Sequence, residues 1–215
     1  MKITKIGHCC LLIEVEGKRI LTDPGSFTVD EVITDNIDMV LITHEHADHI
    51  HIESLQKVIK ASPAVVVVTN AAVGKLLTEA AIAYLVLEGR NQSEFCGIHI
   101  EAYDEKHAEI YKEIGQVQNT GYFIANRLFY PGDSYAIPGK EVEILAFPIG
   151  GPWCRIKDAI EYVLAIKPKN AFPVHDGIER IDRVGILHRI PTTLFPEQGI
   201  NFLPLKAGDT AEFLT

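Results

Sequence analysis

His44-Glu45-His46-Ala47-Asp48-His49 is the stretch that decides the fold, and it directly follows Ile37–Thr43, a nearly continuous apolar run with the sequence IDMVLIT. Such a run is typical of a strand that is covered on both faces. In α/β folds, ligand sites lie at the carboxyl ends of strands of this kind. Imidazole nitrogens and carboxylate oxygens are ligands that borderline divalent cations prefer. We therefore predict a metal site at the end of this strand.

The pattern on both sides of this motif alternates strands with helices. The predicted strands are Lys2–Ile6, Leu11–Val15, Lys18–Thr22, Ile37–Thr43, Ala64–Thr69, Ile98–Tyr103, Thr120–Ala125, Arg127–Tyr130, Ile144–Phe147 and Asn170–Val174. The predicted helices begin near Ile52 and cover Ala71–Ala81, Ile156–Lys167 and Asp182–Arg189. Asn70 is expected to cap the second of these helices. This order predicts one α/β domain with mixed sheets over residues 1–215.

The composition fits a folded, acidic protein. The chain has 215 residues, 47% of them hydrophobic, and its 20 Lys and Arg against 29 Asp and Glu give a formal charge of −9. The apolar content excludes disorder, and the lack of Lys/Arg clusters argues against a nucleic-acid partner. No apolar run approaches the roughly 18 residues of a membrane-spanning helix, so no membrane partner is expected. The start lacks a signal-peptide pattern, and we expect a cytoplasmic protein with reduced cysteines.

Three further polar residues follow predicted strands later in the chain. His107 comes after the strand that begins at Ile98, Asp133 after Arg127–Tyr130, and His175 directly after Asn170–Val174. Each of them alone is more often a turn residue. Together with the histidine-rich motif, they predict that several strand ends contribute to one metal centre.

In this order, the ligand set resembles that of the metallo-β-lactamase superfamily. More narrowly, the chain is similar to the small, single-domain metal-dependent hydrolases of that superfamily, the group that includes ascorbate-6-phosphate lactonase-like proteins. The resemblance extends over about Met1 to Gly177, and the HxHxDH motif is its most specific part. The other matching stretches are Ile6–Glu14, Thr22-Asp23-Pro24-Gly25, Pro148–Gly151 and Lys167-Pro168-Lys169.

The resemblance implies an αββα four-layer sandwich with a site for two divalent metal ions at one edge of the sheets. It implies that His44, His46 and His107 hold the first ion. Asp48, His49 and His175 would hold the second, and Asp133 would bridge the two. We expect zinc, although manganese and iron also suit these ligands. Asp48 would also be catalytic, since it would orient the hydroxide that two metal ions generate at neutral pH.

The expected substrate is a small phosphate ester, a phosphodiester or a lactone. The segment Pro152-Trp153-Cys154-Arg155 departs from the pattern of the relatives, so substrate identity stays open. Trp153 could supply a flat apolar wall, and Arg155 could bind an anionic group or be a plain surface residue. His8 could line the pocket or be a structural histidine, and Asp23 could orient a ligand histidine or simply form a turn.

Two other functions use the same ligands. An iron-dependent redox enzyme could handle oxygen or persulfide chemistry on this scaffold, since nitrogen and oxygen ligands also accept iron. A non-catalytic metal-binding protein is the third possibility. The nature of the bound metal would separate these functions, and the oligomeric state stays undetermined.

Overall fold

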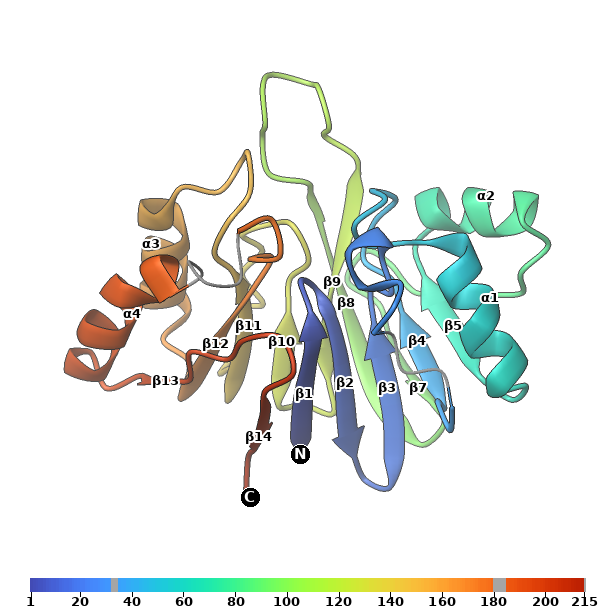
Figure 1. The fold of residues 1–215 in the computed structure, drawn as a ribbon, viewed down its shortest axis with the longest axis horizontal. Coiled ribbons are helices and arrows are strands. Elements are labelled where there is room, and N and C mark those ends of the chain that lie inside the picture. Colours follow the sequence, from blue (N-terminus) through green and yellow to red (C-terminus); the bar gives the residue numbers. More distant parts are fainter. Residues whose placement is uncertain (32–34, 180–184, 215) are drawn as a thin grey trace.

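Two mixed β-sheets face each other at the centre of the molecule in the computed structural model, which describes residues 1–31, 35–179 and 185–214 (Figure 1). The first sheet has the strand order β14-β1-β2-β3-β4-β5-β6, and the second has the order β13-β12-β11-β10-β9-β8-β7. The strands of the first sheet are β1 (Lys2–Gly7), β2 (Cys10–Val15), β3 (Lys18–Thr22), β4 (Met39–Leu41), β5 (Val66–Thr69), β6 (Leu85–Val86) and β14 (Thr210–Glu212). Those of the second are β7 (Gln92–Phe95), β8 (Ile98–Lys106), β9 (Gln118–Ile124), β10 (Leu128–Tyr130), β11 (Ile144–Pro148), β12 (Asn170–Val174) and β13 (Asn201–Phe202).

Helices cover the outer face of each sheet. The helices α1 (Ile52–Ala61) and α2 (Ala71–Glu79) lie on one side of the molecule, and α3 (Ile156–Ile166) and α4 (Gly185–Glu197) lie on the other (Figure 1). One apolar cluster fills the space between the sheets, and two others join each sheet to its helices. These four layers confirm the predicted αββα sandwich.

Strand direction follows from the connections. The β1-β2-β3 meander is antiparallel, whereas β3, β4, β5 and β6 run parallel, with α1 as the crossover from β4 to β5 and α2 as the crossover from β5 to β6. The short strand β4 is fully buried, as expected for the centre of a sheet that is covered on both faces. In the second sheet, β10, β11, β12 and β13 are likewise parallel, and β8, β9 and β10 are antiparallel.

Some boundaries and edges differ from the prediction. The predicted strand Ile37–Thr43 is shortened to β4, and the strand that begins at Ile98 continues to Lys106. The predicted C-terminal end of the last helix, Asp182–Arg189, was wrong, because α4 continues to Glu197. Residues 182–184 of that prediction lie outside the described residues. The predicted cap is confirmed, since the Asn70 side chain accepts a hydrogen bond from the Val73 N–H at 3.0 Å.

Four strands have carboxyl ends that carry the predicted site residues. The motif of residues 44–49 follows β4, His107 follows β8, Asp133 follows β10 and His175 follows β12. A long loop joins β8 to β9 and extends away from the two sheets (Figure 1). No helix in residues 1–31, 35–179 or 185–214 combines the length and apolar character needed to cross a bilayer.

Candidate metal centre

The seven predicted ligands come together as two adjacent groups. In the first group, the ligand atoms of His44, His46 and His107 lie within 4.8 Å of one another. The same limit holds for the second group, which contains Asp48, His49, Asp133 and His175. Each group takes residues from both sheets, because the motif of residues 44–49 follows a strand of the first sheet and the other ligands follow strands of the second.

Asp133 lies between the two groups. Its Oδ2 is 3.3 Å from Nε2 of His107 and 2.8 Å from Nε2 of His175. Its Oδ1 is 3.2 Å from Nε2 of His49. The sharp turn that presents this carboxylate needs Gly132, which has φ +64° and whose Cβ would lie 2.3 Å from Oδ1 of Asn119. Asn119 in turn accepts the Asp133 N–H at 3.0 Å.

Hydrogen bonds on the far side of the imidazole rings determine which nitrogen faces the centre. Nδ1 of His107 lies 2.7 Å from the carbonyl oxygen of Ala108, and Nδ1 of His175 lies 2.8 Å from that of Gly150. A carbonyl oxygen can only accept, so Nδ1 of both rings carries a proton and Nε2 is the nitrogen that faces the centre. Nδ1 of His44 lies 3.0 Å from Oγ1 of Thr43, which donates its own proton elsewhere.

Several buried polar atoms of this centre have no hydrogen-bond partner. Among the described residues, these atoms are Nε2 of His44, His49 and His175, and Oδ1 of Asp133. Leaving such atoms unpaired in the interior costs about 1–3 kcal/mol each. All of them are lone-pair donors that converge on the same space, so the residues fit divalent metal ions.

Asp23 is a buried carboxylate that holds residues of the candidate metal centre in place through hydrogen bonds. Its Oδ1 accepts the Thr43 N–H, and its Oδ2 accepts both the Thr43 hydroxyl and the Tyr130 hydroxyl, at 2.8, 2.8 and 2.5 Å. Oδ2 also lies 2.8 Å from Nδ1 of His49. This carboxylate therefore orients two ligand histidines, directly for His49 and through Thr43 for His44.

Asp48 is the only carboxylate of the described centre with an appreciable exposed side chain, at 23%. Its Oδ2 lies 3.1 Å from Nε2 of His8 and 3.5 Å from Nε2 of His175. Burial by itself would raise the pKa of Asp48, but the contacts with His175 and His8 outweigh it and hold this pKa well below the usual range. Asp48 is therefore a partly exposed carboxylate that stays ionised and accepts hydrogen bonds at any working pH.

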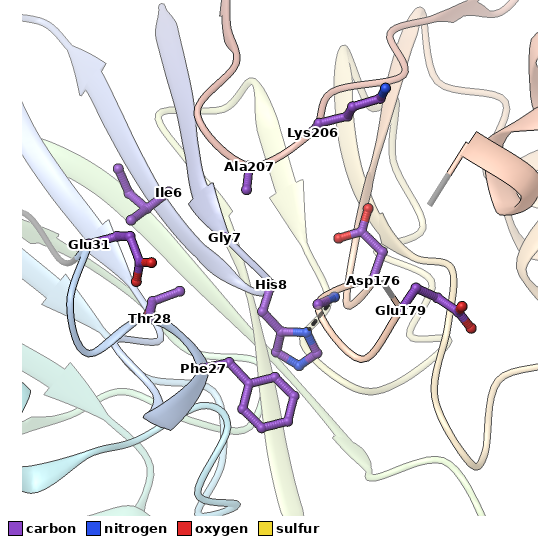
Figure 2. Close-up of a pocket in the computed structure, with 11 residues that line it drawn as sticks. Ile6, Gly7, His8, Phe27, Thr28, Glu31, Asp176, Glu179, Lys206 and Ala207 are labelled. Atoms are coloured by element: carbon purple, nitrogen blue, oxygen red, sulfur yellow. Dashed lines mark hydrogen bonds between the residues drawn. The ribbon is translucent and has the colours of Figure 1, made fainter. Parts of the chain in front are cut away.

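His8 lines a cavity and also forms a hydrogen bond with Asp48. The Gly177 N–H donates to Nδ1 of His8 at 3.1 Å, so the proton of the neutral ring must be on Nε2, which donates to Asp48. Burial lowers the pKa of His8 to about 4, which keeps the ring neutral. Figure 2 shows His8 and Phe27 side by side at one wall of a cavity of about 200 Å³.

Three residues of the site have backbone conformations that L-amino acids rarely adopt. His8, Asp23 and His175 all adopt positive φ values, at 45°, 37° and 60°. Non-glycine residues in this region cost about 1–3 kcal/mol each and occur where the surrounding structure holds them in place. Each of the three residues directly follows a strand, and its side chain contacts a residue of the candidate metal centre or belongs to it.

Trp153 and Arg155 lie differently with respect to the ligands. The ring of Trp153 is 5.4 Å from that of His107 and 5.4 Å from that of His175, so it touches both ligand groups. The side chain of Arg155 is 78% exposed, and its guanidinium donates to Asp158 at 2.7 and 2.8 Å. The structure brings Trp153 to the centre and leaves Arg155 at the surface.

Sequence analysis missed a buried ion pair beneath His175. Lys5 is fully buried, and its Nζ donates to both carboxylate oxygens of Asp176 at 2.7 Å and to the Pro173 carbonyl at 2.8 Å. Nε2 of His188 lies 3.3 Å from Oδ2 of Asp176. This network fixes the turn that carries His175. The sequence gives no signal for it, because lysine is almost never fully buried.

The amino-acid sequence is similar to a known domain family and to several known proteins. Residues 2–175 match the model of the β-lactamase superfamily domain. The chain is 33% identical to Protein Rv0786c of Mycobacterium tuberculosis over 87% of this chain and 90% of that protein. It is 30% identical to a UPF0173 protein of Pyrococcus furiosus over 82% of this chain and 84% of the relative. A protein of Thermoplasma acidophilum named UPF0173 metal-dependent hydrolase is 28% identical, over 81% and 83%.

Solved structures share the fold. Igni18 of Ignicoccus hospitalis, described as a novel metallo hydrolase, superimposes with a TM-score of 0.78 over 99% of both chains. The two sequences are 18% identical, so this likeness concerns the fold alone.

Proposed function

Because the chain belongs to the β-lactamase superfamily domain family and to the UPF0173 proteins within it, we propose that it is a hydrolase that uses two divalent metal ions. The observation that carries this proposal is the set of buried nitrogen and oxygen atoms that have no hydrogen-bond partner among the described residues and that lie close together at the strand ends. His44, His46 and His107 would hold one ion. Asp48, His49 and His175 would hold the other, and Asp133 is close enough to both groups to serve each.

Two ions bound here would lower the pKa of a shared water and polarise the group under attack. The contribution of the protein is to fix the surroundings of that chemistry. Asp48 accepts a hydrogen bond from His8 on Oδ2 and, as an ionised group, could accept a further hydrogen bond from a nucleophile and orient it. The neutral His8 ring supplies this hydrogen bond without adding a charge.

The proposed substrate is a small phosphate ester, a phosphodiester or a lactone. The Trp153 ring lies beside ligands of both groups, which suits a flat apolar wall next to the reacting atoms. Arg155 would act at the rim, where its exposed guanidinium could exchange Asp158 for an anionic group of the substrate. Zinc is the metal that we propose, with manganese and iron as the alternatives that elemental analysis would separate.

Elemental analysis of purified and reconstituted protein, followed by assays on bis-p-nitrophenyl phosphate and a lactone panel, tests this function. We expect metal-dependent hydrolysis that a chelator abolishes and added zinc or manganese restores. A coloured, iron-containing protein with no hydrolysis would instead indicate redox chemistry. A metal-loaded protein that hydrolyses neither class of substrate would contradict the proposal.

A further inference from the structure

Cys9 lies against the second ligand group. It is the second residue of the two-residue turn between β1 and β2, and only 1% of it is exposed. Its sulfur and the ligand nitrogens of His8, His49 and His175 lie within 4.8 Å of one another. The thiol interacts with His49 and lies near His175 and Asp133. A soft donor atom thus borders the position proposed for the second metal ion.

Of the two described residues that lie beside His49 and His175, His8 and Cys9, only Cys9 has an atom free to bind a metal ion. Both ring nitrogens of His8 are already engaged, Nδ1 by the Gly177 N–H and Nε2 by Asp48. The Nε2 atoms of His49 and His175, in contrast, are buried and have no hydrogen-bond partner. These two nitrogens therefore face the position proposed for the cation. The sulfur of Cys9 lies beside them and is a further ligand atom for that cation.

We propose that Sγ of Cys9 is a ligand of the second metal ion, together with His49 and His175. This inference rests on the second metal position of the proposed function, but not on hydrolysis. The thiol loses its proton as the sulfur–metal bond forms, the proton passes to solvent, and nothing is oxidised or reduced. A thiolate makes the second position softer than the first, whose ligands are imidazoles and the shared Asp133 carboxylate. The second position should therefore favour zinc, cobalt or cadmium over magnesium and manganese.

Cys10 provides a matched control. It is the next residue and equally buried, but its side chain belongs to the apolar cluster between the first sheet and helices α1 and α2. Cys9 belongs to the cluster between the two sheets. Serine at either position makes the same chemical change, so only Cys9→Ser should alter the metal spectrum.

Titration of the metal-free full chain with Co²⁺ tests the inference. A thiolate ligand gives a near-ultraviolet thiolate-to-cobalt charge-transfer band, in addition to the visible d–d bands of any bound cobalt. We expect this band in the unmodified protein and in Cys10→Ser, and its loss in Cys9→Ser with the d–d bands retained. A band that persists in Cys9→Ser, or that is absent from the unmodified protein while d–d bands appear, would overturn the assignment.

X-ray absorption of the zinc-loaded unmodified protein keeps the test independent of how well Cys9→Ser folds. We expect a sulfur shell at about 2.3 Å from zinc, and the same shell in Cys10→Ser. A shell of nitrogen and oxygen only would overturn the inference while leaving a zinc hydrolase in place. Failure to bind either metal would overturn the proposed function as well, so the two failures are distinguishable.

Discussion

Oδ2 of Asp23 lies 2.8 Å from Nδ1 of His49, and this contact determines which nitrogen of His49 faces the metal centre. The same carboxylate accepts two hydrogen bonds from Thr43 and one from Tyr130. All these neighbours donate hydrogen bonds to Asp23, so the residue at this position needs a hydrogen-bond acceptor at both ends of its carboxyl group. The orientation of His49, a proposed metal ligand, therefore depends on a residue that follows β3 and lies outside the proposed ligand set.

Asp23→Asn should weaken metal binding at the second position. In either orientation, the amide NH₂ would face a donor, and His49 would lose its fixed tautomer. Loss of such a partner typically lowers metal affinity about 10- to 100-fold. Competition with a chromophoric chelator measures this affinity. Tyr130→Phe, which removes one donor and keeps the carboxylate, should have a smaller effect. Equal affinity in Asp23→Asn and the unmodified protein would contradict the orienting role.

Asp133 should control the number of ions bound, because its carboxylate is close to both ligand groups. Reconstituted protein should hold about two ions per chain, as in two-metal hydrolytic sites. His46→Ala and His175→Ala should each lose one ion, and Asp133→Ala should lose both under the same dialysis. His99→Ala, whose ring bonds Glu101 on β8, serves as the control. A stoichiometry that Asp133→Ala leaves unchanged would rule out the two-ion arrangement.

Asp48→Asn should reduce turnover far more than stability. The carboxylate is partly exposed and would orient the nucleophile in the proposed mechanism, so its loss should lower kcat about 100-fold or more. Asp38→Asn makes the same change of charge at the other end of β4, where the carboxylate bonds Lys18 and the Arg19 N–H. Steady-state kinetics at saturating metal compares the two variants. Full hydrolysis by metal-loaded Asp48→Asn would exclude the catalytic role.

His8 should act through Asp48, as a positioning residue. His8→Phe keeps a ring between Phe27 and His175 but removes the hydrogen bond to Asp48. A hydrogen bond to a charged group contributes about 1.5–3 kcal/mol, so kcat should fall roughly 10- to 150-fold with little change in KM. His8→Gln retains a donor and should recover part of kcat. If both variants lose activity equally, the effect lies in packing rather than in this hydrogen bond.

Arg155 is tested through its partner. Arg155→Ala should raise KM for an anionic substrate and leave a neutral lactone unaffected. Because the guanidinium is largely exposed, we expect only about a tenfold change. Asp158→Asn releases the guanidinium from its carboxylate and should change KM in the opposite direction. If neither variant separates anionic from neutral substrates, Arg155 takes no part in binding.

The central elements were predictable because their patterns are strong. The buried run before His44 gave β4, and the polar residues after β8, β10 and β12 were identified as candidate ligands before any geometry was known. The edge strands β6 and β7 were not predicted, since Leu85, Val86 and most residues of β7 are exposed and show no alternation of buried and exposed positions. Helix α4 passes through Pro191 and Pro196, residues that ordinarily end a helix.

The supporting contacts of the site were less accessible to sequence reasoning. Asp176 and His188 have no recognisable pattern in the sequence, yet in the interior Asp176 pairs with Lys5 and His188 lies 3.3 Å from Asp176. These residues lie far apart in the chain, and only the tertiary fold brings them together. Arg155 was predicted to bind an anionic group or to be a plain surface residue, and its bond to Asp158 at the start of α3 satisfies its charge locally.

Each ligand group draws on both sheets, and this gives bound metal a part in folding. An ion held by His49 and His175 would close the whole chain segment between them, and such closures of long loops are among the most stabilising constraints on an unfolded chain. The centre cannot exist until the two sheets have met. Metal uptake would then be a late event in folding, and loss of the metal would remove one constraint that joins the two sheets, in addition to the apolar cluster between them.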